Sequence, residues 1–148
     1  MTRNEVLVAL RARMDALVAA GAFTADGEAI EVRWDGDNYG PLPDEPAPHA
    51  FCMVEFDPGE QAIEFGEGIG RNRWMSTGTF AVLIYTSATR GAGMGLRVGD
   101  IASAWFRGYR VADLTCFGAA VVDAGRDRNN AGYRRTEVLV DIKFDLIG

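Results

Sequence analysis

Three glycines fall within five residues of the segment TSATRGAGMG, residues 86–95, which follows an apolar run and precedes a helical pattern. A strand, a glycine-rich turn and a helix together form the usual phosphate-binding loop. A P-loop also needs a lysine directly before a serine or threonine, and the chain has none. The dinucleotide pattern GxGxxG fails as well, because Leu96 or Val98 stands where its last glycine belongs. The segment therefore predicts a flexible connection, and we expect no nucleotide cofactor.

The segment DGDNYG, which starts at Asp35, begins like the calcium loop of an EF-hand. Asp35 and Asp37 are placed as ligands and Gly40 as a turn residue. However, Tyr39 replaces an oxygen ligand, and the twelfth position is Pro46 where the motif needs glutamate. A turn rich in Asp, Asn and Gly is the better interpretation, and no metal site is expected.

His49 is the single histidine, and no cysteine spacing surrounds it, so the sequence favours neither a structural zinc nor a Ser-His-Asp triad. No serine lies in a GxSxG nucleophile elbow. His49 is expected to cap the start of a strand. Cys52 and Cys116 both lie in apolar strand-like segments, where a small buried hydrophobe is the usual role and a disulfide or reactive pair is the alternative.

Charged side chains form two contrasting groups. A solvated acidic face explains the carboxylates better than a glycosidase pair does in so small a domain. Arginine far outnumbers lysine. One explanation is that the arginines form interfaces, where the planar guanidinium pairs with two acceptors at once, and the alternative is GC-rich codon usage. The carboxylates are Glu55, Glu60, Glu64 and Glu67, and the arginines are Arg71, Arg73, Arg90, Arg97, Arg107, Arg110, Arg126, Arg128, Arg134 and Arg135.

Length and composition bound the class of protein. The chain has 148 residues, enough for one domain, and its 48% hydrophobic and 24% charged residues are typical of a globular fold. The net charge of −6 argues against gripping nucleic acid, although DNA could pass without being held. No apolar run approaches the roughly 20 residues of a membrane span, and the N-terminus lacks a signal-peptide pattern, so synthesis in the cytoplasm is expected.

The first half of the chain predicts a helix, a short strand and a long loop. Thr2 and Glu5 have the spacing of a capping box, and apolar residues then recur at helical spacing up to Gly21. Alternation over residues 30–34 predicts a half-buried strand. The following segment, residues 35–48, holds four of the five prolines and predicts a long ordered loop.

The second half predicts mainly strands around one more helix. Residues 49–56 and 61–65 flank Asp57-Pro58-Gly59 and predict a hairpin, and the run at 74–87 predicts a central strand, because it is apolar on both faces over 80–85. An amphipathic helix then ends before Gly108, with Trp105 expected to anchor it on the sheet. Two last strands span 114–123 and 133–146. This order predicts a single α+β domain, residues 1–148, with a mainly antiparallel sheet and two helices packed on one face.

Several segments in this order resemble the tail terminator proteins of long-tailed bacteriophages and related gene transfer agents. They are GIGRNRWMSTGTFAVLIYTSATRGAGMG, the helix LRVGDIASAWFRG and the terminal TEVLVDIKFDL. The likeness covers most of the chain. Along the sequence, the matching features are Arg73, Gly78, a strand, a glycine-containing loop, a helix with Asp100, and Phe106-x-Gly108. The order and spacing carry it, because each motif is weak alone.

The resemblance implies a structural virion protein without catalytic residues. Members of the family assemble into a hexameric ring, cap the growing tail tube and present a surface for head joining. The implied partners are further copies of the chain, the tail tube protein and a head-completion or stopper protein. DNA passes through the lumen without specific binding, no membrane is involved, and assembly in the host cytoplasm ends in the virion tail, at its head-proximal end.

A closed ring needs two different patches on each subunit, because its contacts are head-to-tail. The candidate interface segments are 35–39, 71–74, 86–95 and 126–130, and the candidate residues are Asp35, Asn38, Tyr39, Arg71, Arg73, Trp74, Arg90, Met94, Arg126 and Arg128. Two other functions remain open. One is another head-tail connector or tail tube component, and the other is a small-ligand-binding or enzymatic domain with a pocket around Trp34, Trp74 and Trp105.

The sequence contains neither a phosphate-binding loop nor a set of metal ligands, so we expect no binding of nucleotides or metal ions. ATP, other nucleotides and divalent metals should leave the melting temperature unchanged in a thermal-shift assay. A binder at about a hundredfold its dissociation constant stabilises by about 2.7 kcal/mol, so the assay detects one easily. An upward shift with ATP or calcium would contradict the interpretation of both loops.

Overall fold

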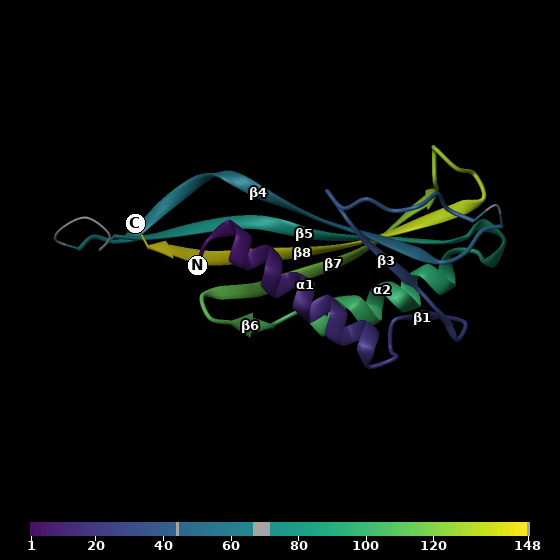
Figure 1. Cartoon of the computed structure of the whole chain (residues 1–148), viewed down its shortest axis with the longest axis horizontal. Helices are drawn as coiled ribbons and strands as arrows, with labels where there is room; N and C mark the ends of the chain where they lie inside the picture. Colours follow the sequence, from purple (N-terminus) through teal and green to yellow (C-terminus); the bar gives the residue numbers. More distant parts are fainter. Residues whose placement is uncertain (44, 67–71, 148) are drawn as a thin grey trace.

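A long sheet is the main structural feature, and the computed structural model describes it within residues 1–43, 45–66 and 72–147 (Figure 1). Within these ranges six strands form one sheet in the order β3-β4-β5-β8-β7-β6, and β1 and β2 form a separate small pair. All neighbours are antiparallel except β3 and β4. The elements are α1 (Arg3–Ala19), β1 (Thr24–Ala25), β2 (Glu28–Ala29), β3 (Glu31–Trp34), β4 (His49–Glu64), β5 (Arg73–Ser87), the 3-10 turn η1 (Ala88–Arg90), α2 (Ala92–Phe106), β6 (Arg110–Val111), β7 (Leu114–Arg126) and β8 (Tyr133–Ile147).

Both helices cover the same face of the sheet, which confirms the predicted α+β arrangement (Figure 1). The Thr2 hydroxyl accepts a hydrogen bond from the Glu5 N–H, and the Glu5 carboxylate accepts one from the Thr2 N–H, so the predicted capping box starts α1. The shared core joins apolar residues of both helices to every second residue of the central strands. It includes Val6, Leu10, Met14 and Leu17 of α1, Val98, Ala102 and Phe106 of α2, and Phe80, Val82, Ile84, Val138, Val140 and Ile142 of the sheet.

β5 occupies the predicted central position, between β4 and β8. Phe80 lies opposite Val54 on one neighbour and Val140 on the other. Its ring also packs edge-on against Phe106 of α2, with the ring centroids 4.9 Å apart. The side chains of β5 that face the helices are buried, and those on the opposite face are half-buried, which explains the apolar character of both faces.

The predicted turn at Asp57-Pro58-Gly59 is wrong. β4 continues through it as one strand to Glu64, with a bulge in its pairing to β5 between Phe56 and Glu60. β3 pairs only with the first four residues of β4, so Pro58 lies on an edge where a missing N–H costs no ladder hydrogen bond. The reversal lies between Glu64 and Arg73 instead, where the Gly66 N–H donates to Asn72 Oδ1 at 3.1 Å.

The glycine-rich segment is only partly a connection, and this corrects the prediction of a flexible loop. α2 begins at Ala92, so Gly93 and Gly95 lie inside the helix. Gly95 and Gly99 face the sheet: a Cβ on Gly95 would collide with the side chain of Thr136, and one on Gly99 would lie 2.7 Å from Val121 Cγ1. The glycines therefore let α2 approach β7 and β8 closely.

Trp105 joins the two helices and is also packed, half-buried, against the shared core. Its indole N–H donates to the Arg13 carbonyl at 2.8 Å, and the Arg13 guanidinium donates back to the Trp105 carbonyl at 2.7 Å. The same guanidinium lies 4.0 Å from the centroid of the indole ring. A half-buried cation–π contact with two reciprocal hydrogen bonds thus connects α1 to α2.

Both cysteines are buried and free, which confirms their predicted role as small hydrophobes. Burial raises the pKa of the Cys52 thiol to about 12 and that of Cys116 to about 11. At neutral pH both thiols are therefore protonated and unreactive.

The close approach of α2 can be tested with two glycine-to-alanine variants of the same helix. Gly99→Ala should lower the free energy of unfolding by roughly 1–2 kcal/mol, because the added methyl overpacks the contact with Val121. Gly93→Ala is the matched control, since a Cβ there meets nothing within 4 Å, and it should be neutral or stabilising by up to about 1 kcal/mol. Chemical denaturation measures both, and equal stability of the two variants would contradict the packing.

Candidate functional site

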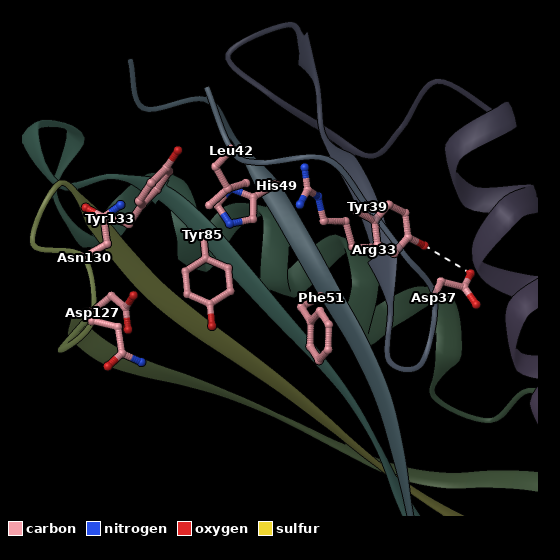
Figure 2. A pocket seen from close by; sticks show the side chains of 11 residues that line it. Arg33, Asp37, Tyr39, Leu42, His49, Phe51, Tyr85, Asp127, Asn130 and Tyr133 are labelled. Carbon is pink, nitrogen blue, oxygen red and sulfur yellow. Dashed lines mark hydrogen bonds between the residues drawn. The ribbon is translucent and has the colours of Figure 1, made fainter. Parts of the chain in front are cut away.

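A cavity of about 430 Å³ lies on the open face of the sheet, which is the face opposite the helices (Figure 2). It is formed where β3, β4, β5 and β8 come together with two loops, residues 35–48 and residues 127–132. Aromatic and apolar side chains form its walls, and charged and amide groups lie around them. The lining residues are Arg33, Asp37, Tyr39, Leu42, His49, Phe51, Tyr85, Asp127, Asn129, Asn130 and Tyr133.

Three rings pack together at the centre of this cavity. His49 and Tyr85 are directly opposite each other on β4 and β5, and their rings stack with centroids 4.8 Å apart. Tyr133, the first residue of β8, meets the His49 ring edge-on, also with the centroids 4.8 Å apart. Cross-strand register therefore builds an aromatic cluster from three strands, and Figure 2 shows the rings grouped beneath Leu42.

The proline-rich loop is held over the cavity through Ala47. The Ala47 N–H donates to the Tyr133 hydroxyl at 3.1 Å, and the Ala47 carbonyl lies 3.0 Å from His49 Nδ1. Because a carbonyl only accepts, Nδ1 must carry the proton, and this fixes the tautomer of the neutral ring. One clamped residue thus positions the loop, and Leu42 from the same loop lines the cavity.

His49 is 7% exposed, and burial lowers the pKa of its imidazole. The hydrogen bond to the Ala47 carbonyl opposes this shift, and the nearby Arg33 guanidinium adds to it. Glu31 and Asp127 act weakly in the opposite direction. The lowered pKa favours the neutral imidazole at pH 7.

Asp37 and Tyr39 are fixed by contacts inside the chain. The Tyr39 hydroxyl accepts from the Trp34 N–H at 2.9 Å and donates to the Asp37 carboxylate at 3.3 Å. Arg11 of α1 pairs with the same carboxylate at 2.7 Å, and this hydrogen bond lowers the pKa of Asp37. Arg33 lies over the Tyr39 ring, 5.3 Å from its centroid. The wall near β3 is thus preformed.

The β7–β8 connection provides the opposite wall and a basic surface beside it. Asp127, Asn129 and Asn130 line the cavity, and a smaller neighbouring hollow is lined by Arg126, Arg128 and Arg135. Both Arg126 and Arg128 are exposed. This end of the sheet therefore combines an apolar cavity with exposed guanidinium groups.

The structure brings some of the predicted interface residues together and separates the others. Tyr39 lies at the cavity, with Asp35 and Asn38 exposed in the same loop, and Arg126 and Arg128 lie beside it. Arg73 and Trp74 lie at the far end of the sheet, where Arg73 forms ion pairs with Asp145 and Glu64. Arg90 pairs with Asp26, and Met94 is a core residue only 8% exposed. Arg71 lies outside the described residues.

Sequence reasoning missed the centre of the cavity. It placed His49 at a strand start, which is confirmed, but did not connect it to Tyr85 and Tyr133. His49 pairs with Tyr85 because β4 continues, with a bulge, past Asp57-Pro58-Gly59. A turn at these residues, as the sequence predicts, would not pair His49 with Tyr85. The suggested tryptophan pocket is also absent from the described structure. Trp34 stacks on Phe80, Trp105 joins the helices, and Trp74 lies opposite Ala62 and Leu146.

Comparisons with known proteins bear on the fold alone. No protein-family model matches the chain, and no curated protein matches it. Five chains of solved structures match, and one of them aligns with 100% of this chain and 99% of its own, at 14% identity and a TM-score of 0.63. The α+β fold is therefore similar to a known structure over its whole length.

Within the described residues, no group of three or more His, Cys, Asp or Glu side chains is arranged to hold a metal ion. No helix in the described ranges is long and apolar enough to cross a membrane.

The buried imidazole gives a pH prediction. Since the folded protein holds the His49 pKa below its ordinary value near 6.5, the unfolded chain takes up the proton first as the pH falls. The free energy of unfolding should be constant just above pH 7 and should decrease as the pH falls below about 6.5. Denaturant titrations of the wild type and His49→Gln measure this, and the variant should lose that decrease. A His49 NMR titration midpoint at or above 6.5 would contradict the assignment.

Proposed function

We propose that this chain is a tail terminator subunit of a long-tailed bacteriophage or gene transfer agent. In this proposal six copies form a ring that caps the tail tube, ends its growth and offers a surface for joining the head. The order of sequence motifs supports the terminator role. The main structural support is that both helices cover the same face of the sheet. The other face and one long edge are free to meet partners.

The open face of the sheet is partly apolar. Met53 is 36% exposed and Val122 42%, and Leu83 and Leu139 lie between them on β5 and β8. Phe117, at a bulge in β7, is 54% exposed. Glu137 of β8 lies between Leu83 and Val122 in the same row, so the apolar side chains surround one charged position. Exposed apolar side chains grouped in this way on a small domain are typical of protein–protein contact.

The two outer edges of the sheet differ in chemistry. β6 covers only the first two residues of β7, and residues 117–122 of the remaining edge carry no charge. The free part of β4 carries Glu55, Asp57, Pro58 and Glu60, which are features that discourage edge pairing. An uncharged edge beside an apolar face is where an added strand or a neighbouring subunit can dock.

Different surfaces at the two sides of one subunit favour head-to-tail association, which closes into a ring when the rotation between copies allows it. The net charge of −6 suits a lumen through which DNA slides without sticking. A tail tube or connector component would share these features. A cap differs because one of its faces fits the last tube ring and the other does not bind the next.

Tube growth distinguishes these roles. When assembling tail tube protein is mixed with this chain, tubes should stay short and carry a terminal ring in electron micrographs. Ala120→Glu, on the exposed open face near the β7 edge, should abolish the effect. Ala16→Glu on the exposed side of α1 is the matched control and should keep it. Tubes of unchanged length, or this chain along their whole body, would contradict the terminator role.

A further inference from the structure

We propose that the aromatic cavity binds a guanidinium group, the side chain of an arginine that a partner protein presents. The cavity offers such a group several aromatic faces and one carboxylate without a counter-ion. This inference goes beyond the proposed function and does not rest on it, because it names the chemistry that the cavity binds.

Five aromatic rings line the cavity, and only one of them carries a cation. The Arg33 guanidinium lies over the Tyr39 ring. In the described part of the chain no cation lies over the rings of Phe51, Tyr85 or Tyr133. The face of an aromatic ring attracts a cation within about 6 Å of its centroid, and more strongly where water is excluded. These three rings can therefore contact a bound cation.

The charged residues of the cavity wall leave one carboxylate without a counter-ion. Arg33 pairs with Glu31 at 3.1 Å, and Asp37 pairs with Arg11 at 2.7 Å. Asp127 is half-buried, and no basic side chain among the described residues forms an ion pair with it. A partly buried charge is stabilised by an opposite charge, so this wall favours a cationic ligand.

Arg126 and Arg128 flank Asp127 in the sequence but do not line the cavity. Both are exposed and line the neighbouring hollow, which Asp127 also borders. Water and salt screen exposed charges of this kind. Figure 2 shows Asp127 toward the end of the cavity where Tyr133 lies, and Arg33 toward the other end. The end with Asp127 is therefore the one that accepts a cation.

A guanidinium suits this end better than an ammonium group does. Its plane stacks on a ring while two of its N–H groups pair with one carboxylate, whereas an ammonium group is a point charge. The Ala47 clamp and the Tyr39 hydrogen bond preform the walls, so binding orders few groups. The other charges of the described wall are already paired, so none of them selects the ammonium and carboxylate groups of a free amino acid. An arginine within a protein is therefore the expected source.

Titration with blocked amino acids tests this chemistry on the full chain. N-acetyl-arginine amide and N-acetyl-citrulline amide have nearly the same shape, and only the arginine compound is charged. The arginine compound should bind at least roughly tenfold more tightly, with NMR shifts at Asp127 and Tyr85. Equal affinity for the two compounds, or binding of neither, would overturn the inference.

A pair of charge variants separates a local carboxylate from the general acidity of the chain. Asp127→Asn should weaken binding of the arginine compound by roughly tenfold or more and leave the melting temperature unchanged. Asp15→Asn removes the same charge at an exposed position on α1 and should change the affinity by less than about twofold. An equal loss in both variants would show attraction to net charge alone and would contradict the site.

A pair of ring variants tests the aromatic contribution. Phe51→Leu keeps an apolar side chain in the cavity but removes the aromatic face, so it should weaken binding roughly fivefold or more. Phe117→Leu, at the exposed bulge of β7, is the matched control and should leave the affinity unchanged. Wild-type affinity in Phe51→Leu would mean that the rings do not hold the cation.

Free arginine distinguishes the two possible sources of the guanidinium. It should bind within about twofold of the blocked amide, because only the side chain is recognised. Binding of free arginine at least roughly tenfold more tightly would overturn the side-chain source and indicate a small-molecule site. Tube growth is a separate readout: selective arginine binding with unchanged tubes keeps this inference and removes the terminator role, and short tubes without arginine binding do the reverse.

Discussion

The close contact between α2 and the β7–β8 pair holds the helices on one face of the sheet. Gly95 and Gly99 lie where a side chain would collide with Thr136 or Val121, so the helix lies directly on the sheet. The position of α2 in turn fixes α1, through the reciprocal hydrogen bonds of Trp105 and Arg13. Both helices are thereby committed to one face, and the opposite face is left open.

That open face carries a preformed aromatic cavity at one end, next to the exposed Arg126 and Arg128. The proline-rich loop belongs to this end, since His49 and Tyr133 hold it through Ala47. The two outer edges of the sheet also differ, because β4 carries charges and a proline where residues 117–122 of β7 carry no charge. Unlike edges favour head-to-tail association, which a closed ring of identical chains requires.

Much of the fold could be predicted from the sequence, because local periodicity decides it. The capping box, the amphipathic helices and the central strand of residues 80–85 all follow from nearest neighbours along the chain. The cavity could not, because Tyr85 meets His49 only through a long-range register with a bulge in β4. The residues Asp57-Pro58-Gly59 predicted a turn, but the strand continues through them. Pro58 is tolerated there because β4 is an edge strand at this position.

Native mass spectrometry tests whether these chains form the proposed closed ring. A closed hexamer should give one dominant species of six copies of the 16.0 kDa chain, with no larger open-ended series. A monomer at all accessible concentrations would contradict it, and so would a continuous ladder of oligomers, because neither is a closed ring.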